Sequence, residues 1–258
     1  MANNSPDEPV RVALVQMTVV GGDIDGNLAR AHERIAAAAA LGARIAVLPE
    51  CLDSGWTFPT ARDLATDVPG GALCALLAES AREHGMVVCA GLTERDSDRV
   101  YNTAVLLGPD GRLLSRHRKI NELAIAHGVY DQGDRLSVVP TPMGTLGTLV
   151  CADAVARGGA LLNSLALMGA DIILSPCAWA VAPDHDNTVD PYGTLWRDAY
   201  TGIAKEQGCA VVGVSNVGWV VGGAWDGWRC IGCSLAVDTD GRELLQAPYG
   251  ADADGIHL

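Results

Sequence analysis

Short apolar runs alternate with helix-forming segments through the first third of this chain. Each run is nearly continuous in apolar residues, which predicts strands buried on both faces. These runs are Val10–Met17, Arg44–Leu48 and Met86–Ala90. The segments between them, 27–41 and 72–84, have helical character and stop before a glycine, with Asn27 as the expected N-cap of the first. Repeated strand–helix–strand units predict an α/β fold.

Hairpins interrupt this alternation in the rest of the chain. Turn sequences at 108–111 and 238–241 each separate two predicted strands. The strand pairs are Val100–Leu107 with Arg112–Arg116, and Cys230–Val237 with Arg242–Gln246. Hairpins combined with strand–helix units favour two packed sheets with helices outside. No break in composition divides the chain, so we expect one domain over residues 1–258, with residues 1–8 disordered.

The stretch from Gly144 to Trp179 contains the cysteine most suited to chemistry. Thr145–Val150 is a predicted buried strand, Cys151 follows it, and a helix-spaced apolar segment then runs to Gly169. A cysteine between a strand and a helix lies at a sharp turn, where free helix N–H groups lower the thiol pKa and can bind an oxyanion. The alternative is a small buried hydrophobic residue, which is the commoner role of cysteine.

Composition excludes several classes of partner. A net charge of −13 argues against nucleic acid or an anionic membrane surface. No apolar run approaches the length of a membrane span, and the first eight residues lack the features of a signal peptide, so we expect a cytoplasmic protein. In that reducing compartment the eight cysteines are not expected to form disulfides. Cys230 and Cys233 have C-x-x-C spacing without a second ligand pair, so ordinary packing is favoured over a metal or redox role.

Three reactive side chains lie near the ends of predicted strands: Glu50, Lys119 and Cys151. Sites in open α/β folds collect where strands end. A buried carboxylate can act as base toward a thiol, and a neighbouring ammonium can stabilise both the thiolate and the oxyanion of a tetrahedral intermediate. No histidine is placed as an obvious partner for the cysteine. Each residue alone could be an ordinary surface charge or core residue, but the three together favour a catalytic site.

Three motif blocks resemble the signatures of the nitrilase superfamily of carbon–nitrogen hydrolases. They are Leu48-Pro49-Glu50, His117-Arg118-Lys119-Ile120-Asn121 and Val150-Cys151-Ala152-Asp153, and they stand in the family's order. No single block is specific, but the ordered set is. Other segments are similar to the family's remaining strands and turns: Val12–Met17, Ser54–Trp56, Tyr101–Ala104, Gly169–Pro176, Ser215–Gly218 and Gly232–Ser234.

The resemblance implies a four-layer α-β-β-α sandwich, paired across its helices into a homodimer or higher homo-oligomer. It also implies a Glu-Lys-Cys triad that works without metal or organic cofactor. In that scheme Glu50 takes the thiol proton, Cys151 attacks the amide carbon, and ammonia or an amine leaves. Water then hydrolyses the thioester, with Lys119 and the backbone N–H of Ala152 as the oxyanion hole.

The chain departs from the family pattern in three places. The usual aromatic residue and Arg-aromatic-Pro-Glu run are missing after Cys151, where Ala152 stands instead. The position of a second family glutamate, counted back from Gly133-Asp134, is Ala126, and Glu122 is the nearest carboxylate that could substitute. The terminal strand and dimer-stabilising tail are expected to be short or absent, because the sequence stops at Leu258. Candidate accessory or substrate-binding residues are therefore Glu122, Ala152, Asp153 and Trp179, while Arg157 and His185 are not diagnostic.

The predicted function is hydrolysis of a small linear amide or N-carbamoyl compound. Nitrile-cleaving members usually have Trp-Glu after the cysteine, which this chain lacks, so a nitrilase is the alternative within the family. A member that has lost hydrolysis and serves as a binding or scaffold protein is the alternative of another class. A thiol-redox protein using Cys230 and Cys233 is a third.

Overall fold

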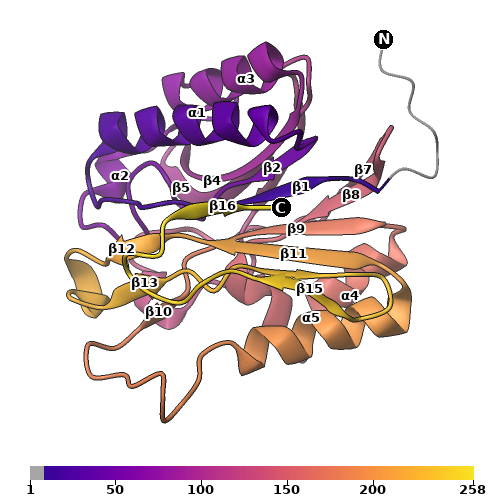
Figure 1. The fold of residues 1–258 in the computed structure, drawn as a ribbon. Coiled ribbons are helices and arrows are strands. Elements are labelled where there is room, and N and C mark those ends of the chain that lie inside the picture. The colour runs from indigo at the N-terminus through magenta and orange to yellow at the C-terminus, as the bar shows by residue number, and fades with distance from the viewer. Residues whose placement is uncertain (1–8) are drawn as a thin grey trace.

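Two mixed β-sheets face each other in the centre of the molecule, as Figure 1 shows. The computed structural model describes residues 9–258, so the disorder expected for residues 1–8 lies outside the described residues. The first sheet has the order β16-β1-β2-β4-β5-β6, with β3 beside β4. Its strands are β1 Val12–Gln16, β2 Ile45–Val47, β3 Thr66–Asp67, β4 Val87–Asp96, β5 Arg99–Leu107, β6 Leu113–Arg118 and β16 Gly255–His257.

The second sheet has the order β15-β14-β11-β9-β8-β7. Its strands are β7 Val138–Thr141, β8 Gly144–Thr148, β9 Ile172–Cys177, β11 Ala210–Ser215, β14 Leu235–Val237 and β15 Glu243–Gln246. Within each sheet the central strands pair in parallel, whereas the hairpins form antiparallel edges. A small third sheet, made of β10 Ala180–Val181, β12 Val217–Trp219 and β13 Arg229–Ile231, lies at one end of the sandwich.

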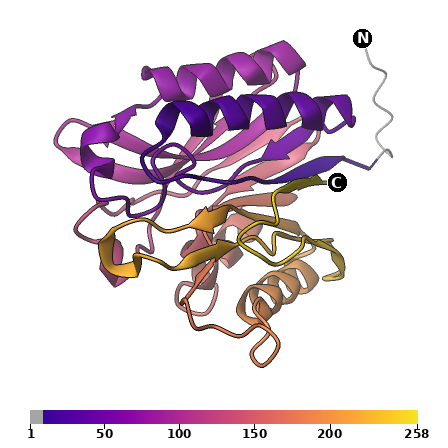
Figure 2. The same ribbon diagram turned by 60° about the vertical axis from the view of Figure 1, so that its left-hand side comes forward.

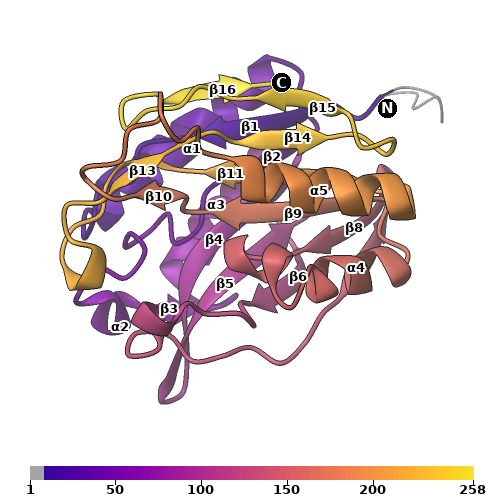
Figure 3. The ribbon, with the colours of Figure 1, turned by 90° about the horizontal axis from the view of Figure 1, so that it is seen from below.

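Helices cover the outer faces of the two sheets. Figure 1 shows α1 (Ile24–Ala40) and α3 (Ala72–His84) above the first sheet, and Figure 3 shows α4 (Ala160–Leu167) and α5 (Thr194–Gln207) across the second. The short helix α2 is Ala61–Leu64, and the 3-10 helices are η1 Ala124–Ala126, η2 Cys151–Val155 and η3 Gly223–Trp225. Within residues 9–258, none of the helices combines the length and the apolar character needed to cross a membrane.

Alternation along the strands explains the layers. In β2, Ile45 and Val47 belong to a core shared with Leu174 of the opposite sheet, while Ala46 belongs to the core under α1 and α3. The same division gives the second sheet a core under α4 and α5, which includes Ile173. Each central strand is therefore buried on both faces, as its continuous apolar run predicted. The predicted α-β-β-α sandwich is confirmed, and Figure 2 shows its layers from a second direction.

Two local expectations were wrong. The first helix begins at Ile24 with Asp23 as its cap, and Asn27 instead lies buried inside it, bonded to Val20 and Asp53. The predicted strand Cys230–Val237 is split between β13 and β14, which lie in different sheets, because Gly232 and Cys233 adopt positive φ. The terminal strand, expected to be short or absent, is present as the three-residue strand β16, which pairs with β1.

Candidate active site

Glu50, Lys119 and Cys151 follow the ends of strands β2, β6 and β8. Backbone pairing continues up to them, through the bonds Leu48 N to Cys89 O (2.8 Å), Lys119 N to Asn102 O (2.8 Å) and Leu149 N to Leu174 O (3.0 Å). The first two strands belong to one sheet and the third to the other. All three side chains line a single cavity of about 200 Å³, so the packing of the two sheets assembles the site.

Glu50 is held by two charged or polar donors inside the core. Its Oε1 accepts a hydrogen bond from Lys119 Nζ at 2.6 Å and another from Asn102 Nδ2 at 2.6 Å. Its backbone N–H donates to Cys177 O at 3.2 Å, across to the second sheet. Sequence reasoning missed the role of Asn102, although the block Tyr101–Ala104 around it was recognised as family-like. The carboxylate is therefore fixed in position, with its second oxygen left for chemistry.

Lys119 is a buried cation between two carboxylates. Its side chain is 1% exposed, with Nζ 2.6 Å from Glu50 Oε1 and 3.8 Å from Glu122 Oε2. Burial alone would lower the lysine pKa, but the charges of Glu50 and Glu122 outweigh it and raise the pKa well above its usual value. Lys119 Nζ also lies 5.7 Å from the centre of the Trp56 ring. The lysine therefore remains charged and can stabilise a developing oxyanion.

Cys151 lies at a strained turn and carries a protonated thiol. Its φ is +47°, and its N–H donates to Ser175 Oγ at 3.1 Å. A hydrogen bond with Cys177, burial and the charge of Glu50 raise its thiol pKa well above the usual value, against the opposing charge of Lys119. The expected lowering of this pKa by a helix N-terminus was wrong, because only the short 3-10 helix η2 starts here and α4 begins at Ala160. The sulfur therefore needs a base when it attacks.

Ala152 lines the cavity next to the cysteine. Its backbone N–H lies in the first turn of η2, where N–H groups have no partner inside the helix. Its carbonyl accepts from Asn121 Nδ2 at 2.8 Å, which ties the following peptide, Ala152–Asp153, to the lysine block. The arrangement leaves a donor beside Cys151, as an oxyanion hole requires.

Asp153 does not face the cavity, contrary to a substrate-binding role. It is fully buried, and its two oxygens accept four hydrogen bonds from both motif blocks. The donors are Ile120 N (3.0 Å), Asn121 N (2.7 Å), Val150 N (3.2 Å) and His117 Nε2 (2.7 Å). Asp153 therefore ties the chain after Lys119 to the turn that carries Cys151. His117 belongs to the same contact, a role that sequence reasoning did not assign.

Glu122 lies behind the lysine and is the second carboxyl of the site. Its side chain is 2% exposed, and neither oxygen has a hydrogen-bond partner among the described residues. Burial raises its pKa to about 8, against the opposing charge of Lys119. Ala126, at the position where the family has its second glutamate, is fully buried in η1 and packs in a cluster with Tyr130. Glu122 thus lies beside Lys119, although its place in the sequence differs from that of the family's second glutamate, which corresponds to Ala126.

Tryptophans form much of the cavity wall. Trp179 is 2% exposed and stacks on Trp196 with ring centres 4.9 Å apart. Trp56 meets the edge of Trp225 at 5.0 Å. All four line the cavity, whereas Arg157 and His185 do not. Of these four, sequence reasoning assigned Trp179 a possible substrate contact and noted Trp56 only as part of a motif. It did not name Trp196 or Trp225, because they come from segments distant from the motif blocks.

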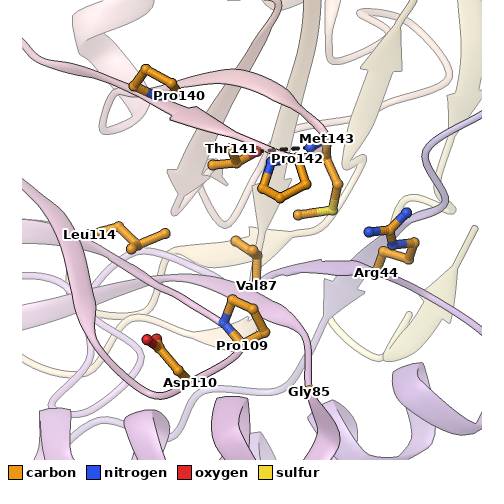
Figure 4. Close-up of a pocket in the computed structure, with 10 residues that line it drawn as sticks. All are labelled: Arg44, Gly85, Val87, Pro109, Asp110, Leu114, Pro140, Thr141, Pro142 and Met143. Carbon is orange, nitrogen blue, oxygen red and sulfur yellow. Dashed lines mark hydrogen bonds between the residues drawn. The ribbon is translucent and has the colours of Figure 1, made fainter. Parts of the chain in front are cut away.

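A second cavity, of about 280 Å³, lies at the opposite ends of the same strands (Figure 4). Its lining includes Arg44 just before β2, Val87 at the start of β4, and Met143 just before β8. None of the predicted catalytic residues lines it, and it contains no cysteine. The candidate active site is therefore the smaller of these two cavities, the one that contains Cys151.

The C-x-x-C pair is buried in the core. Cys230 and Cys233 are free thiols, 3% and 4% exposed, and they flank the turn at Gly232. Within residues 9–258, no group of three or more His, Cys, Asp or Glu side chains is placed to hold a metal ion.

Comparisons with known proteins agree with the motif blocks. Residues 11–256 match the model of the carbon–nitrogen hydrolase family. A nitrilase of Pyrococcus abyssi is 32% identical over 216 residues, which cover 81% of this chain and 80% of that protein. An omega-amidase of Xenopus laevis is 34% identical over 207 residues, covering 76% of this chain and 74% of that protein.

The fold is shared with solved structures. The solved structure of an amidase from Nesterenkonia sp. AN1 superposes with a TM-score of 0.81 at 22% identity, covering 96% of this chain and 91% of that one. The resemblance in the motif blocks is confirmed by these matches. The chain therefore belongs to the carbon–nitrogen hydrolase family, the nitrilase superfamily.

Proposed function

We propose that this protein hydrolyses small linear amides, and N-carbamoyl compounds as a related class, through a thioester on Cys151. The single observation that carries the proposal is the buried Glu50–Lys119 ion pair, 2.6 Å between Oε1 and Nζ, in the same cavity as Cys151. Two opposite charges taken out of water beside a thiol are costly, and such placement is typical of functional sites. The amidase and omega-amidase relatives support the amide as substrate.

In the proposed first half-reaction, Glu50 removes the Cys151 proton as the sulfur attacks the carbonyl carbon. The raised thiol pKa suits this order, because the proton stays on sulfur until the substrate arrives. The carbonyl oxygen becomes an oxyanion that accepts hydrogen bonds from Lys119 Nζ and Ala152 N–H. The C–N bond then breaks, and the nitrogen leaves as ammonia or an amine with the proton that Glu50 had taken.

In the second half-reaction, water attacks the thioester carbon while Glu50 accepts a proton from it. The same two donors hold the oxyanion. The C–S bond breaks, the proton returns to sulfur and the carboxylic acid leaves. We assign Glu122 to holding Lys119 in place, and Asp153 to holding the lysine and cysteine segments together.

Ammonia release tests the proposal and separates it from a nitrilase. The purified protein is incubated with matched amides, carbamoyl compounds and nitriles. We expect release from amides or carbamoyl compounds. Release from nitriles alone would overturn the preference. Cys151→Ala should abolish turnover, and Glu50→Gln should lower kcat by about 10²- to 10⁴-fold, the usual contribution of a general base.

Mass spectrometry tests the alternative of a binding or scaffold protein. A hydrolase should accumulate an acyl group on Cys151, and Cys151→Ala should show no added mass. A protein that binds an amide but forms neither ammonia nor an acylated cysteine would instead fit the binding role. Loss of function in Cys230→Ser with Cys151→Ala unaffected would favour the thiol-redox alternative.

A further inference from the structure

Aromatic residues are concentrated at the candidate active site of a chain that is otherwise poor in them. The chain has six tryptophans, five tyrosines and one phenylalanine. Four of the six tryptophans line the cavity around Cys151: Trp56, Trp179, Trp196 and Trp225. Trp179 and Trp196 are stacked with their planes 21° apart, and Trp225 is stacked in turn on Trp228 at 4.1 Å. These rings support one another, so the wall offers flat apolar surface before any ligand binds.

Within the part of the chain that the structure describes, the cavity has no unpaired cation for a substrate carboxylate. Among residues 9–258, Glu50 and Lys119 are the only charged side chains that line it, and they are bonded to each other. Lys119 also lies 3.8 Å from Glu122, so its charge already has partners. A substrate carboxylate placed against the tryptophans would lose its hydration and gain no counter-charge, which is strongly unfavourable.

The cavity volume limits the substrate to a small molecule. It is about 200 Å³, below the range of roughly 300–1,000 Å³ that is usual for drug-sized ligands. An apolar cavity of about 150 Å³ can hold one benzene molecule. One ring with a short linker and an amide group is therefore close to the upper limit of size. Leu195, which lines the cavity and is 60% exposed, marks its mouth at the start of α5.

From these three features we propose that the substrate is a small amide with an uncharged, apolar acyl group. Branched aliphatic and single-ring acyl groups are bound between the tryptophan pairs, and acyl groups that end in a carboxylate are rejected. The inference rests on the amide hydrolysis proposed above and specifies its substrate class.

A pair of amides of the same shape tests the charge requirement. Isocaproamide and succinamate differ in that two methyl groups of the first replace the two carboxylate oxygens of the second. We expect kcat/KM for isocaproamide to exceed that for succinamate by at least about 100-fold, because the cavity leaves the carboxylate unpaired. Equal or faster hydrolysis of succinamate would overturn the substrate class while leaving amide hydrolysis intact. If neither amide releases ammonia and Cys151 is not acylated, the proposed function itself fails, and the substrate class with it.

Two surface variants test whether an added cation makes the cavity accept a carboxylate. Leu195→Arg places a cation at the cavity mouth, and we expect it to raise kcat/KM for succinamate relative to isocaproamide about fivefold, the effect of one partly exposed ion pair. Val189→Arg is the matched control, because Val189 is 80% exposed and does not line the cavity. An equal effect of both variants would show only a change in overall charge and would contradict the proposal.

A tryptophan variant tests the aromatic wall. Trp225→Leu should lower kcat/KM for hydrocinnamamide by about fivefold to tenfold and change that for acetamide much less, since only the larger amide reaches this ring. Trp219→Leu is the control, because Trp219 is 56% exposed and lies outside the cavity lining. An equal loss on both amides in Trp225→Leu would contradict substrate recognition by this wall.

Discussion

At the scale of single residues, the site depends on three ionisable side chains that are almost fully removed from water. Lys119 lies between Glu50 and Glu122, and Glu50 is the larger of the two influences that raise its pKa. Glu122 itself has no hydrogen-bond partner among the described residues, and burial raises its pKa to about 8. Near neutral pH Glu122 is therefore mostly protonated, as a neutral acid beside Lys119.

Glu122 should make stability depend on pH in a defined window. Its pKa is about 8 in the folded protein and about 4.3 in an unfolded chain, so between these values the folded state keeps a proton that the unfolded state has lost. The free energy of unfolding should fall as pH rises through this window, by at most about 1.4 kcal/mol per pH unit, and level off above pH 8.

Thermal unfolding of Glu122→Gln across this pH range measures the effect. The variant cannot ionise at this position, so its melting temperature relative to the native protein should rise from pH 5 towards pH 8. Glu79→Gln is the control, since the Glu79 side chain is 70% exposed. A constant difference across the range would mean that Glu122 is ionised in the folded protein throughout.

At the scale of elements, the turn that starts η2 connects the two motif blocks. Asp153 accepts bonds from Ile120 and Asn121 on one side and from Val150 on the other. These bonds place the residues next to Lys119 beside the residue before Cys151. The position of the segment between β8 and α4 is thus fixed by the hydrogen bonds of a buried carboxylate rather than by helix geometry.

Asp153→Asn should lower kcat about 10- to 100-fold and leave KM within a few-fold. The amide keeps only one acceptor oxygen, so either the bonds from Ile120 and Asn121 or the bond from Val150 are lost, and the oxyanion donors shift relative to the sulfur. Steady-state kinetics, corrected for the fraction of Cys151 that can be alkylated, separates this effect from partial unfolding. Asp171→Asn is the control, because Asp171 accepts from Thr145 N at the start of the same strand. A similar kcat loss in both variants would indicate general weakening of β8.

The turn between β13 and β14 should be intolerant of a side chain. A Cβ on Gly232 would lie 2.3 Å from the Gln16 side chain, which cannot move because it donates to Pro248 O and Ala253 O. Gly158 has a similar positive φ and no atom within 4 Å of a built Cβ. We expect Gly158→Ala to cost about 1 kcal/mol from backbone strain alone.

Urea unfolding of Gly232→Ala should then show a loss larger by about 2 kcal/mol or more, from the steric clash and the displaced bonds of Gln16. Equal losses in the two variants would mean that the core around Gln16 adapts to the extra methyl group.

At the scale of the whole molecule, the packing of two sheets determines which cysteine is accessible. All eight cysteines are buried free thiols, and those other than Cys151 are at most 4% exposed. Cys151 is 8% exposed and lines the cavity of about 200 Å³. Access rather than thiol acidity therefore separates it from the others, since burial also raises the pKa of Cys74 and Cys230.

Native protein treated with iodoacetamide should gain a single label, located on Cys151, whereas protein in urea should gain eight. Peptide mass spectrometry identifies the site, and a bound apolar amide should slow the labelling. Because the Cys151 thiol pKa is raised, labelling should accelerate as pH rises above the usual thiol range. Lys119→Ala should slow the labelling relative to the native protein, because it removes the charge that favours the thiolate. Labelling of Cys74 or Cys209 as fast as Cys151 would contradict the assignment of the nucleophile.

The amino-acid sequence by itself determined the layers and pointed to the candidate catalytic residues. Continuous apolar runs such as Arg44–Leu48 predict doubly buried strands, and two sheets with helices outside are the arrangement that buries both faces of such strands. The motif blocks identify Glu50, Lys119 and Cys151 because those residue types stand at strand ends in a recognisable order. This information is local, and periodicity and turn residues express it directly.

Only the tertiary structure decided how those residues are surrounded. The raised pKa of the Cys151 thiol, the burial that raises the pKa of Glu122 and the use of Asp153 as a link arise from packing against other segments. The cavity wall joins tryptophans that lie far apart in the sequence. Burial and partner identity depend on which strand ends meet when the sheets pack, and no local pattern contains that information. The same physics makes Cys151 the accessible thiol among eight buried cysteines.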